Sequence, residues 1–109
     1  MDRTLVRQSD DVFRAIADPT RRDLLGLLAE TEQPVNRLAE PFAMSRPAIS
    51  QHLRILRDAG LVAERKVGRE RFYRLEATPL RAVSEWAAQY ERFWHERLDA
   101  LGTYLEETR

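Results

Sequence analysis

The apolar residues in the first part of the chain recur three or four positions apart, which is the spacing of amphipathic helices. The pattern predicts a first helix from Ser9 or Asp10 to Ala17, a second from Thr20 to Glu30 and a short third from Val35 to Pro41. Asp18 and Pro19 lie between the first two helices, and this pair is typical of a helix cap followed by the first helical residue. The leucines of the second helix are expected to be buried: Leu24, Leu25, Leu27 and Leu28.

The segment 45–59 predicts a fourth helix with two different faces. Ile49, Leu53 and Leu56 recur at i, i+4 and i+7 and form one stripe that is expected to be buried. Ser45, at the start of the segment, is a suitable N-cap. The opposite face is polar and basic, and the residues on or near it are Arg46, Ser50, Gln51, Arg54 and Arg57.

A hairpin and a long helix complete the pattern. Gly60 is suited to end the fourth helix, since a glycine in the left-handed conformation commonly follows a helix. Two stretches rich in β-branched and aromatic residues, Val62–Val67 and Glu70–Leu75, are expected to pair around a turn at Gly68–Arg69. A final helix is expected over residues 78–107, with a length of about 43 Å at 1.5 Å per residue.

Composition narrows the class of protein. The chain has 109 residues, of which 43% are hydrophobic and 33% charged, as in an ordinary soluble single domain. It has no cysteine, which excludes disulfides and thiolate metal sites. No apolar run approaches the ~18 residues that span a bilayer, and the charged N-terminus lacks the apolar core of a signal peptide. The expected location is therefore cytoplasmic, with no membrane partner.

Charge is distributed unevenly, although the net charge of the chain is zero. Residues 45–75 hold eight basic and three acidic side chains, a net charge of +5, whereas the segments on both sides are net acidic. This basic segment coincides with the fourth helix and the hairpin. Of the 18 basic residues of the chain, 17 are arginines, whose guanidinium groups can form two parallel hydrogen bonds with phosphate or guanine.

Two short helices joined by a tight turn, with a basic second helix and a basic hairpin, are typical of a winged helix-turn-helix on double-stranded DNA. The major groove accepts one α-helix, and residues near its N-terminus reach the base edges, while the hairpin contacts the flanking backbone or minor groove. We expect base contacts from Arg46, Ser50 and Gln51. Contacts with phosphate or from the wing are expected from Ser45, Pro47, His52, Arg54, Arg57, Lys66, Arg69 and Arg71.

The final helix carries more apolar surface than one chain of this length can bury. Its apolar residues follow a near-heptad spacing, which favours pairing with a second copy around a twofold axis. The two DNA-binding heads of such a homodimer are expected about 34 Å apart, one turn of B-DNA. The expected interface residues of this helix are Tyr90, Trp94, Leu98, Leu101 and Leu105.

The predicted fold is mainly α with a small β-hairpin: one dimeric winged helix-turn-helix domain over residues 1–109, with about five helices and a two-stranded wing. A DNA-binding core is expected over residues 10–77 and a dimerisation helix over residues 78–107. The predicted function is sequence-specific regulation of transcription. A second interpretation is a protein-interaction module that keeps this fold but has lost DNA binding, which the zero net charge and the aromatic last helix favour. An enzyme is the weakest interpretation, because no Gly-rich phosphate loop or Ser–His–acid pattern is present.

Three segments resemble the ArsR family of winged-helix repressors: Phe13–Arg22, Met44–Val62 and the wing Gly68–Leu75. The middle segment is the specific part, and the resemblance covers roughly residues 10–105. It implies a homodimeric repressor on a palindromic operator, with repression relieved by a signal, so an unknown small-molecule inducer is a possible partner. It also implies that the first and last helices form the dimer interface, which adds Phe13 to the expected interface residues.

The sequence departs from the founding, metal-sensing members of that family. They carry a cysteine pair at the start of the third helix, and alignment on Leu38–Ala39 places Pro34 and Asn36 at those positions. That metal site is therefore absent, and no cofactor is expected. The leucine-rich ending with Trp94 resembles a metal-independent branch of the family.

A second family site uses histidine and carboxylates on the last helix. The residues that fall on one face there are Glu91, His95 and Asp99. They either bind a metal across a dimer or form a solvated face with charge pairs four residues apart. The incomplete ligand set favours the solvated face, and no metal is expected.

Overall fold

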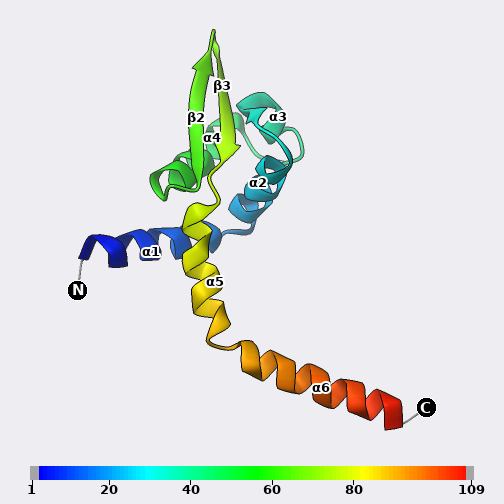
Figure 1. Cartoon of the computed structure of the whole chain (residues 1–109). Coiled ribbons are helices and arrows are strands. Elements are labelled where there is room, and N and C mark those ends of the chain that lie inside the picture. Colours follow the sequence, from blue (N-terminus) through cyan, green and yellow to red (C-terminus); the bar gives the residue numbers. More distant parts are fainter. Residues whose placement is uncertain (1–2, 108–109) are drawn as a thin grey trace.

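The structure is a computed structural model that describes the backbone of residues 3–107 and, within it, the side chains of residues 10–98, 100–102 and 105. Figure 1 shows one body formed by the first four helices and a projecting hairpin, from which the last two helices extend. The predicted mainly helical fold with a small β element is confirmed. In chain order the elements are α1 (Arg3–Ile16), α2 (Pro19–Glu30), β1 (Gln33–Pro34), α3 (Val35–Ala39), α4 (Arg46–Asp58), β2 (Val62–Val67), β3 (Glu70–Leu75), the 3-10 turn η1 (Thr78–Leu80), α5 (Arg81–Ala88) and α6 (Glu91–Glu107).

The corner between α1 and α2 is formed by the cap that the sequence predicts. The Asp18 carboxylate accepts the backbone N–H of Arg21 at 3.1 Å, and Pro19 follows as the first helical residue. This hydrogen bond lowers the pKa of Asp18 below its usual value, because it favours the charged form. The corner is thus defined by residues that are adjacent in the sequence.

Among the first four helices, two ends differ from the prediction by more than one residue. α1 begins at Arg3 rather than at Ser9 or Asp10, because neither glycine nor proline interrupts the helix in the preceding residues. α3 ends at Ala39 rather than at Pro41, because a proline has no N–H with which to continue the helical hydrogen bonds. Both differences lie at helix ends and leave the order of elements unchanged.

The core lies between the first four helices and the base of the hairpin. Leu25 and Leu28 of α2 are buried as predicted, whereas Leu27 is only half-buried. The α4 stripe contributes three of the buried residues, so the back of this helix is held by the core. The largest fully buried side chains are Leu24, Leu38, Ile49, Leu53, Leu56, Leu61 and Val12.

A small antiparallel sheet carries the hairpin. β2 and β3 pair over their whole length, from Val62 opposite Leu75 to Val67 opposite Glu70, which confirms the predicted strands. Gly68 has a φ of +62°, a left-handed conformation that suits the first position of a two-residue turn. The two-residue strand β1, which the sequence did not predict, pairs with the other edge of β3 and gives the order β1-β3-β2.

The prediction of one continuous helix over residues 78–107 is wrong, because the segment is divided between α5 and α6. The backbone N–H of Tyr90 donates to the Ala87 carbonyl, and that of Phe93 donates to the Tyr90 carbonyl, both at 3.0 Å. Bonds spanning three residues therefore replace the four-residue bonds of an α-helix at this point. The rings of Trp86 and Tyr90 meet edge to face at the break, with centroids 5.5 Å apart. The break sends α6 away from the body (Figure 1).

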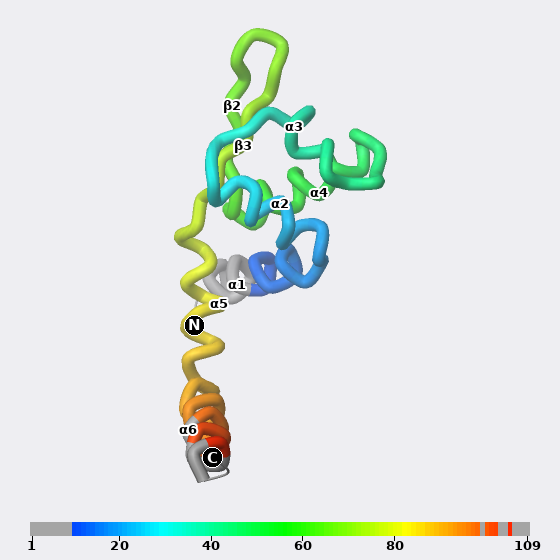
Figure 2. The backbone as a smooth tube through the Cα atoms, turned by 90° about the vertical axis from the view of Figure 1, so that its right-hand side faces the viewer, coloured from blue at the N-terminus to red at the C-terminus, as the bar shows by residue number. Residues whose placement is uncertain are grey.

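The direction of α6 makes the molecule elongated. Its radius of gyration is 18.4 Å, whereas a compact chain of this length has about 13 Å. Figure 2, turned by 90°, shows the same separation of α6 from the body. Every side chain of α6 that the structure describes is exposed. Among the described residues, no helix has both the length and the apolar character needed to cross a membrane.

Candidate nucleic-acid interface

The two faces of α4 are those that the sequence predicts. Ile49, Leu53 and Leu56 are fully buried on its inner side. The Ser45 hydroxyl accepts the backbone N–H of Ala48 at 3.3 Å and so caps the helix, as predicted. The polar side chains expected on the outer face are all exposed: Arg46, Ser50, Gln51, Arg54 and Arg57.

The hairpin adds a second basic surface. Lys66 and Arg71 lie directly opposite each other on β2 and β3, and both are exposed. Like charges at opposite positions destabilise a strand pair, so this pair is suited to an anion that neutralises both. Arg69 occupies the turn and is also exposed. The structure therefore brings the three expected wing residues together near the tip of the hairpin.

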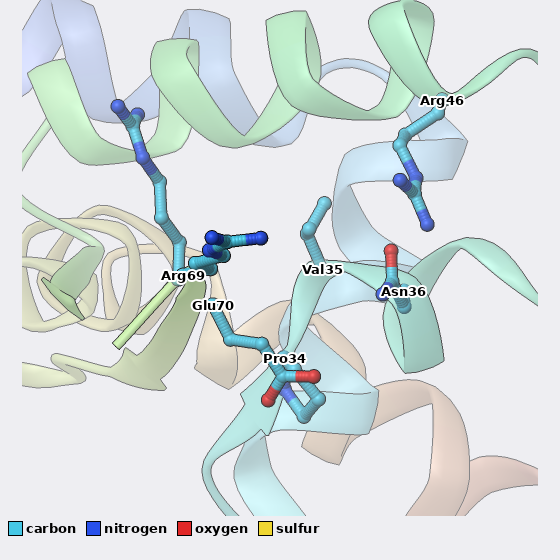
Figure 3. A pocket seen from close by; sticks show the side chains of 7 residues that line it. Pro34, Val35, Asn36, Arg46, Arg69 and Glu70 are labelled. Atoms are coloured by element: carbon cyan, nitrogen blue, oxygen red, sulfur yellow. The ribbon is translucent and has the colours of Figure 1, made fainter. Parts of the chain in front are cut away.

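A groove made of two adjoining hollows lies between α4 and the hairpin. Val35 and Arg71 line both hollows, which places the hollows side by side. The first has a volume of about 210 Å³ (Figure 3) and is lined by Pro34, Val35, Asn36, Arg46, Arg69, Glu70 and Arg71. The second has a volume of about 220 Å³ and is lined by Val35, Ser50, Arg54, Arg57, Arg71 and Tyr73. We call the two together the basic groove, because five arginines and one glutamate line it.

Asn36 is a member of the basic groove that the sequence did not single out. It lies in the first turn of α3 and is exposed. Figure 3 shows Asn36 and Arg46 pointing toward each other across the first hollow. The sequence offered no signal for this residue, because a short helix before the turn has no pattern that marks its outer face.

Comparisons with known proteins agree with this architecture. The family model described as "Bacterial regulatory protein, arsR family" matches residues 18–64. The HTH-type transcriptional regulator Rv2034 of Mycobacterium tuberculosis is 40% identical over 100 residues, which cover 92% of this chain and 91% of that protein. The chain belongs to the arsR family.

Two further relatives bear on the class of this arsR-family protein. The transcriptional repressor SdpR of Bacillus subtilis is 37% identical over 81 residues, or 74% of this chain and 90% of SdpR. A solution structure from Mycobacterium bovis is described as a homodimeric winged helix-turn-helix DNA-binding domain of a possible ArsR-family regulator. It matches with a TM-score of 0.67 and 30% identity, covering 81% of this chain and 84% of that one. The predicted class, a winged helix-turn-helix transcriptional regulator, is confirmed.

One carboxylate of this arsR-family protein lies against the arginines of the basic groove. Glu64 Oε1 accepts a hydrogen bond from Arg57 Nη1 at 2.9 Å, and its Oε2 lies 3.8 Å from Arg71 Nη1. Burial raises the pKa of Glu64, but Tyr73, Arg57 and Arg71 lower it more, so it lies below its usual value. The hydrogen bond with Glu64 also raises the pKa of Arg57. Arg57 was expected to face phosphate, and in the free protein it faces Glu64, which the sequence did not single out.

His52 lies at the edge of the outer face of α4. Its side chain is half-buried. Its Nδ1 atom lies 3.2 Å from Nη1 of Arg21, a residue of α2. The imidazole is therefore turned at least partly toward the corner between α1 and α2. The sequence gave no reason to pair these two residues, which are 31 positions apart.

The residues expected at a dimer interface form an exposed apolar surface on this arsR-family chain. Tyr90, Trp94, Leu98, Leu101 and Leu105 are between 44% and 63% exposed. Phe13 of α1 is half-buried, because its ring packs edge to face against the Trp86 ring at a centroid distance of 5.7 Å. Trp86 links the α1 part of this surface to the α6 part and is itself 50% exposed.

The possible metal ligands on α6 are only partly described. His95 Nε2 lies 3.3 Å from Oε1 of Glu91, which is four residues earlier on the same helix. The side chain of Asp99 lies outside the described residues. Among the described side chains, no group of three histidine, cysteine or acidic residues is placed to hold a metal ion.

Proposed function

We propose that this chain is a homodimeric repressor that binds a palindromic operator, with α4 in the major groove and the hairpin on the flanking backbone or minor groove. The observation that carries this proposal is the basic groove, whose five arginines come from both α4 and the hairpin. A duplex presents its phosphates as a continuous ridge between the two grooves, and a cationic groove of this kind suits that ridge. The named repressor and the named homodimer among the relatives support it. A role on DNA implies a cytoplasmic location.

Base contacts are assigned to the first half of α4. Arg46, Ser50 and Gln51 are exposed there, outside the buried stripe. Arginine can donate two hydrogen bonds to guanine, and glutamine can pair with adenine in the same way. These three residues therefore account for sequence preference.

Phosphate contacts are assigned to the second half of α4, to its N-terminus and to the hairpin. Ser45 and Pro47 lie in the N-terminal turn, where the helix dipole favours an anion. Arg57 is paired with Glu64 in the free protein, and a phosphate would take the place of that carboxylate. Arg54, Lys66, Arg69 and Arg71 are assigned to the same set, and contact of His52 Nε2 with phosphate is the alternative that the His52 variants described below test.

Dimerisation is assigned to α5 and α6 together with Phe13 of α1. Trp94, Leu98 and Leu101 of α6 are exposed in the single chain, and a second copy around a twofold axis would cover them. In this assignment residues 10–77 form the DNA-binding core and residues 78–107 the dimerisation segment of one domain.

The test of DNA binding compares Arg46→Ala with Arg69→Ala. Arg46→Ala is expected to lower the preference for the operator over a scrambled duplex about tenfold, because a base contact is lost. Arg69→Ala is expected to weaken binding to both duplexes equally and to lower the slope of log affinity against log salt by about one. The preference for the operator and the salt slope are both measured by titrating labelled duplex with protein at several salt concentrations. Retention of a protein partner but of no duplex would favour the protein-interaction module instead.

Glu64→Gln is expected to raise affinity for any duplex about tenfold, because it removes the negative charge that pairs with Arg57 and Arg71 and competes with phosphate. The measurement is the dissociation constant for a scrambled duplex at fixed salt. Glu76→Gln is the matched control, since Glu76 pairs with Arg74 outside the basic groove. An equal gain in the two variants would show that only net charge matters.

A further inference from the structure

Arg21 holds the end of α1. Its Nε donates to the Ala15 carbonyl at 2.6 Å and its Nη2 donates to the Arg14 carbonyl at 3.0 Å. These carbonyls belong to the last turn of α1, where a helix lacks internal donors. The neighbouring Arg22 donates in the same way to the Ile16 carbonyl at 2.8 Å. The start of α2 therefore caps the end of α1 with two arginine side chains.

The third nitrogen of the same guanidinium group reaches α4. Arg21 Nη1 lies 3.2 Å from His52 Nδ1. Arginine can only donate, so when this contact is a hydrogen bond Nδ1 is the acceptor and Nε2 is the ring nitrogen that can donate outward. One planar, half-buried group thus joins the end of α1, the start of α2 and the middle of α4.

The contact constrains α4 in a way that its apolar side does not. Leu53, the next residue after His52, is fully buried, and Gln51, the residue before it, is exposed. Apolar packing is not directional and permits small rotations of a helix about its axis. A hydrogen bond at the edge of the buried stripe is directional and limits that rotation. Base readout needs side chains placed to within about half an ångström, so a small rotation is enough to impair it.

We propose that Arg21 and His52 are positioning residues that set the orientation of α4 relative to α1. This inference rests on the proposed function, DNA binding through α4. α1 also packs against α5 through Phe13 and Trp86, next to the surface assigned to dimerisation. In a dimer the Arg21–His52 contact therefore helps to set the position of each α4 relative to the other. Its loss reduces discrimination between operator and other DNA, while affinity for phosphate alone remains.

Two substitutions of His52 separate this role from direct contact with phosphate through Nε2. In His52→Asn the amide oxygen can occupy the place of Nδ1, which keeps the acceptor for Arg21 and removes the outward donor. In His52→Gln the amide reaches the place of Nε2, which keeps the outward donor and removes the acceptor. The operator probe is a duplex that the original protein selects from random-sequence DNA, and the control duplex has the same bases in scrambled order. The measurements are the dissociation constants for both duplexes, the salt slope of each, and the melting temperature of the full chain.

We expect His52→Asn to stay within about threefold of the original discrimination, and His52→Gln to lose about tenfold with an unchanged salt slope. The reverse order, with a shallower salt slope for His52→Asn, would identify His52 as a phosphate donor and overturn the inference. Equal discrimination in both variants and the original protein would overturn it as well. Failure of the original protein to bind any duplex would instead refute the proposed function, and the inference with it.

A second pair of variants keeps the test valid if a His52 variant is unstable. Arg21→Lys retains the charge but cannot serve two carbonyls and His52 at once, because an ammonium group is a single point donor. Arg22→Lys is the matched control, since Arg22 caps α1 through the Ile16 carbonyl. We expect similar small losses in melting temperature but a loss of discrimination only in Arg21→Lys. Equal discrimination in the two variants would contradict the positioning role.

Discussion

Leu98→Glu is expected to dissociate the dimer and to lower operator affinity by at least about 100-fold. Leu98 is 63% exposed in the single chain and lies on the apolar stripe of α6 with Trp94 and Leu101. A twofold axis places the new carboxylate at the interface twice. Each of them would be buried without a partner, which costs several kcal/mol. The DNA-binding core of a dissociated monomer makes only half of the operator contacts of the dimer, so operator affinity falls.

Sedimentation at micromolar concentration measures the assembly, and titration of a labelled operator measures the affinity. Glu96→Lys is the control, because it alters charge on the polar side of the same helix and is expected to leave both quantities nearly unchanged. Sedimentation of the unaltered protein as a 12.8 kDa species would refute the dimer itself. Operator affinity that is retained by a monomeric Leu98→Glu variant would show that one head is sufficient.

Leu53→Ala is expected to lower the free energy of unfolding by about 3–4 kcal/mol. The Leu53 side chain is fully buried, so its truncation leaves a cavity under the middle of α4 in addition to the lost transfer energy. A domain of this size has a total stability of about 5–15 kcal/mol, so this loss is a large part of the whole. Urea unfolding followed by circular dichroism measures the change.

Arg54→Ala, one residue further along α4, is the matched comparison. Arg54 is exposed and lines the basic groove. Its truncation is expected to change the free energy of unfolding by less than about 0.5 kcal/mol and to weaken binding to every duplex. A stability loss at Arg54 as large as that at Leu53 would contradict the division of α4 into a structural side and a binding side.

Local signals explain which parts of the fold could be predicted. The Asp18–Pro19 corner, the Ser45 cap and the hairpin turn at Gly68 depend on residues next to one another in the sequence, and all three are present. β1 was missed because it has only two residues, one of them a proline, and exists through pairing with β3. Tertiary contacts rather than local preference define such a strand.

The break between α5 and α6 had no signal that the pattern could show. Neither glycine nor proline is present there, and the spacing of Tyr90, Trp94 and Leu98 continues through the break without a change. A hydrophobic period reports which residues share a face, not whether the backbone is continuous. The break depends on three-residue hydrogen bonds and ring contacts that only the folded chain contains.

The sequence predicts which side chains of α4 are exposed in the candidate site, but not which residues of other elements they contact. Helical spacing alone separates the buried stripe of α4 from Arg46, Ser50 and Gln51. The contacts of Arg57 with Glu64 and of His52 with Arg21 join different elements, so no periodicity reports them. These contacts give Arg57 and His52 partners that the sequence did not predict, although both residues lie where the sequence placed them.

Both tryptophans of the chain lie outside the DNA-binding core: Trp86 is in α5 and Trp94 in α6. In the single chain Trp86 and Trp94 are 50% and 55% exposed, so water reaches both residues. Association through α5 and α6 would transfer both rings to an apolar environment and shift their fluorescence emission to shorter wavelength. Contact of α4 with DNA occurs in a part of the chain without tryptophan. Intrinsic emission therefore reports association separately from DNA binding, without any added label.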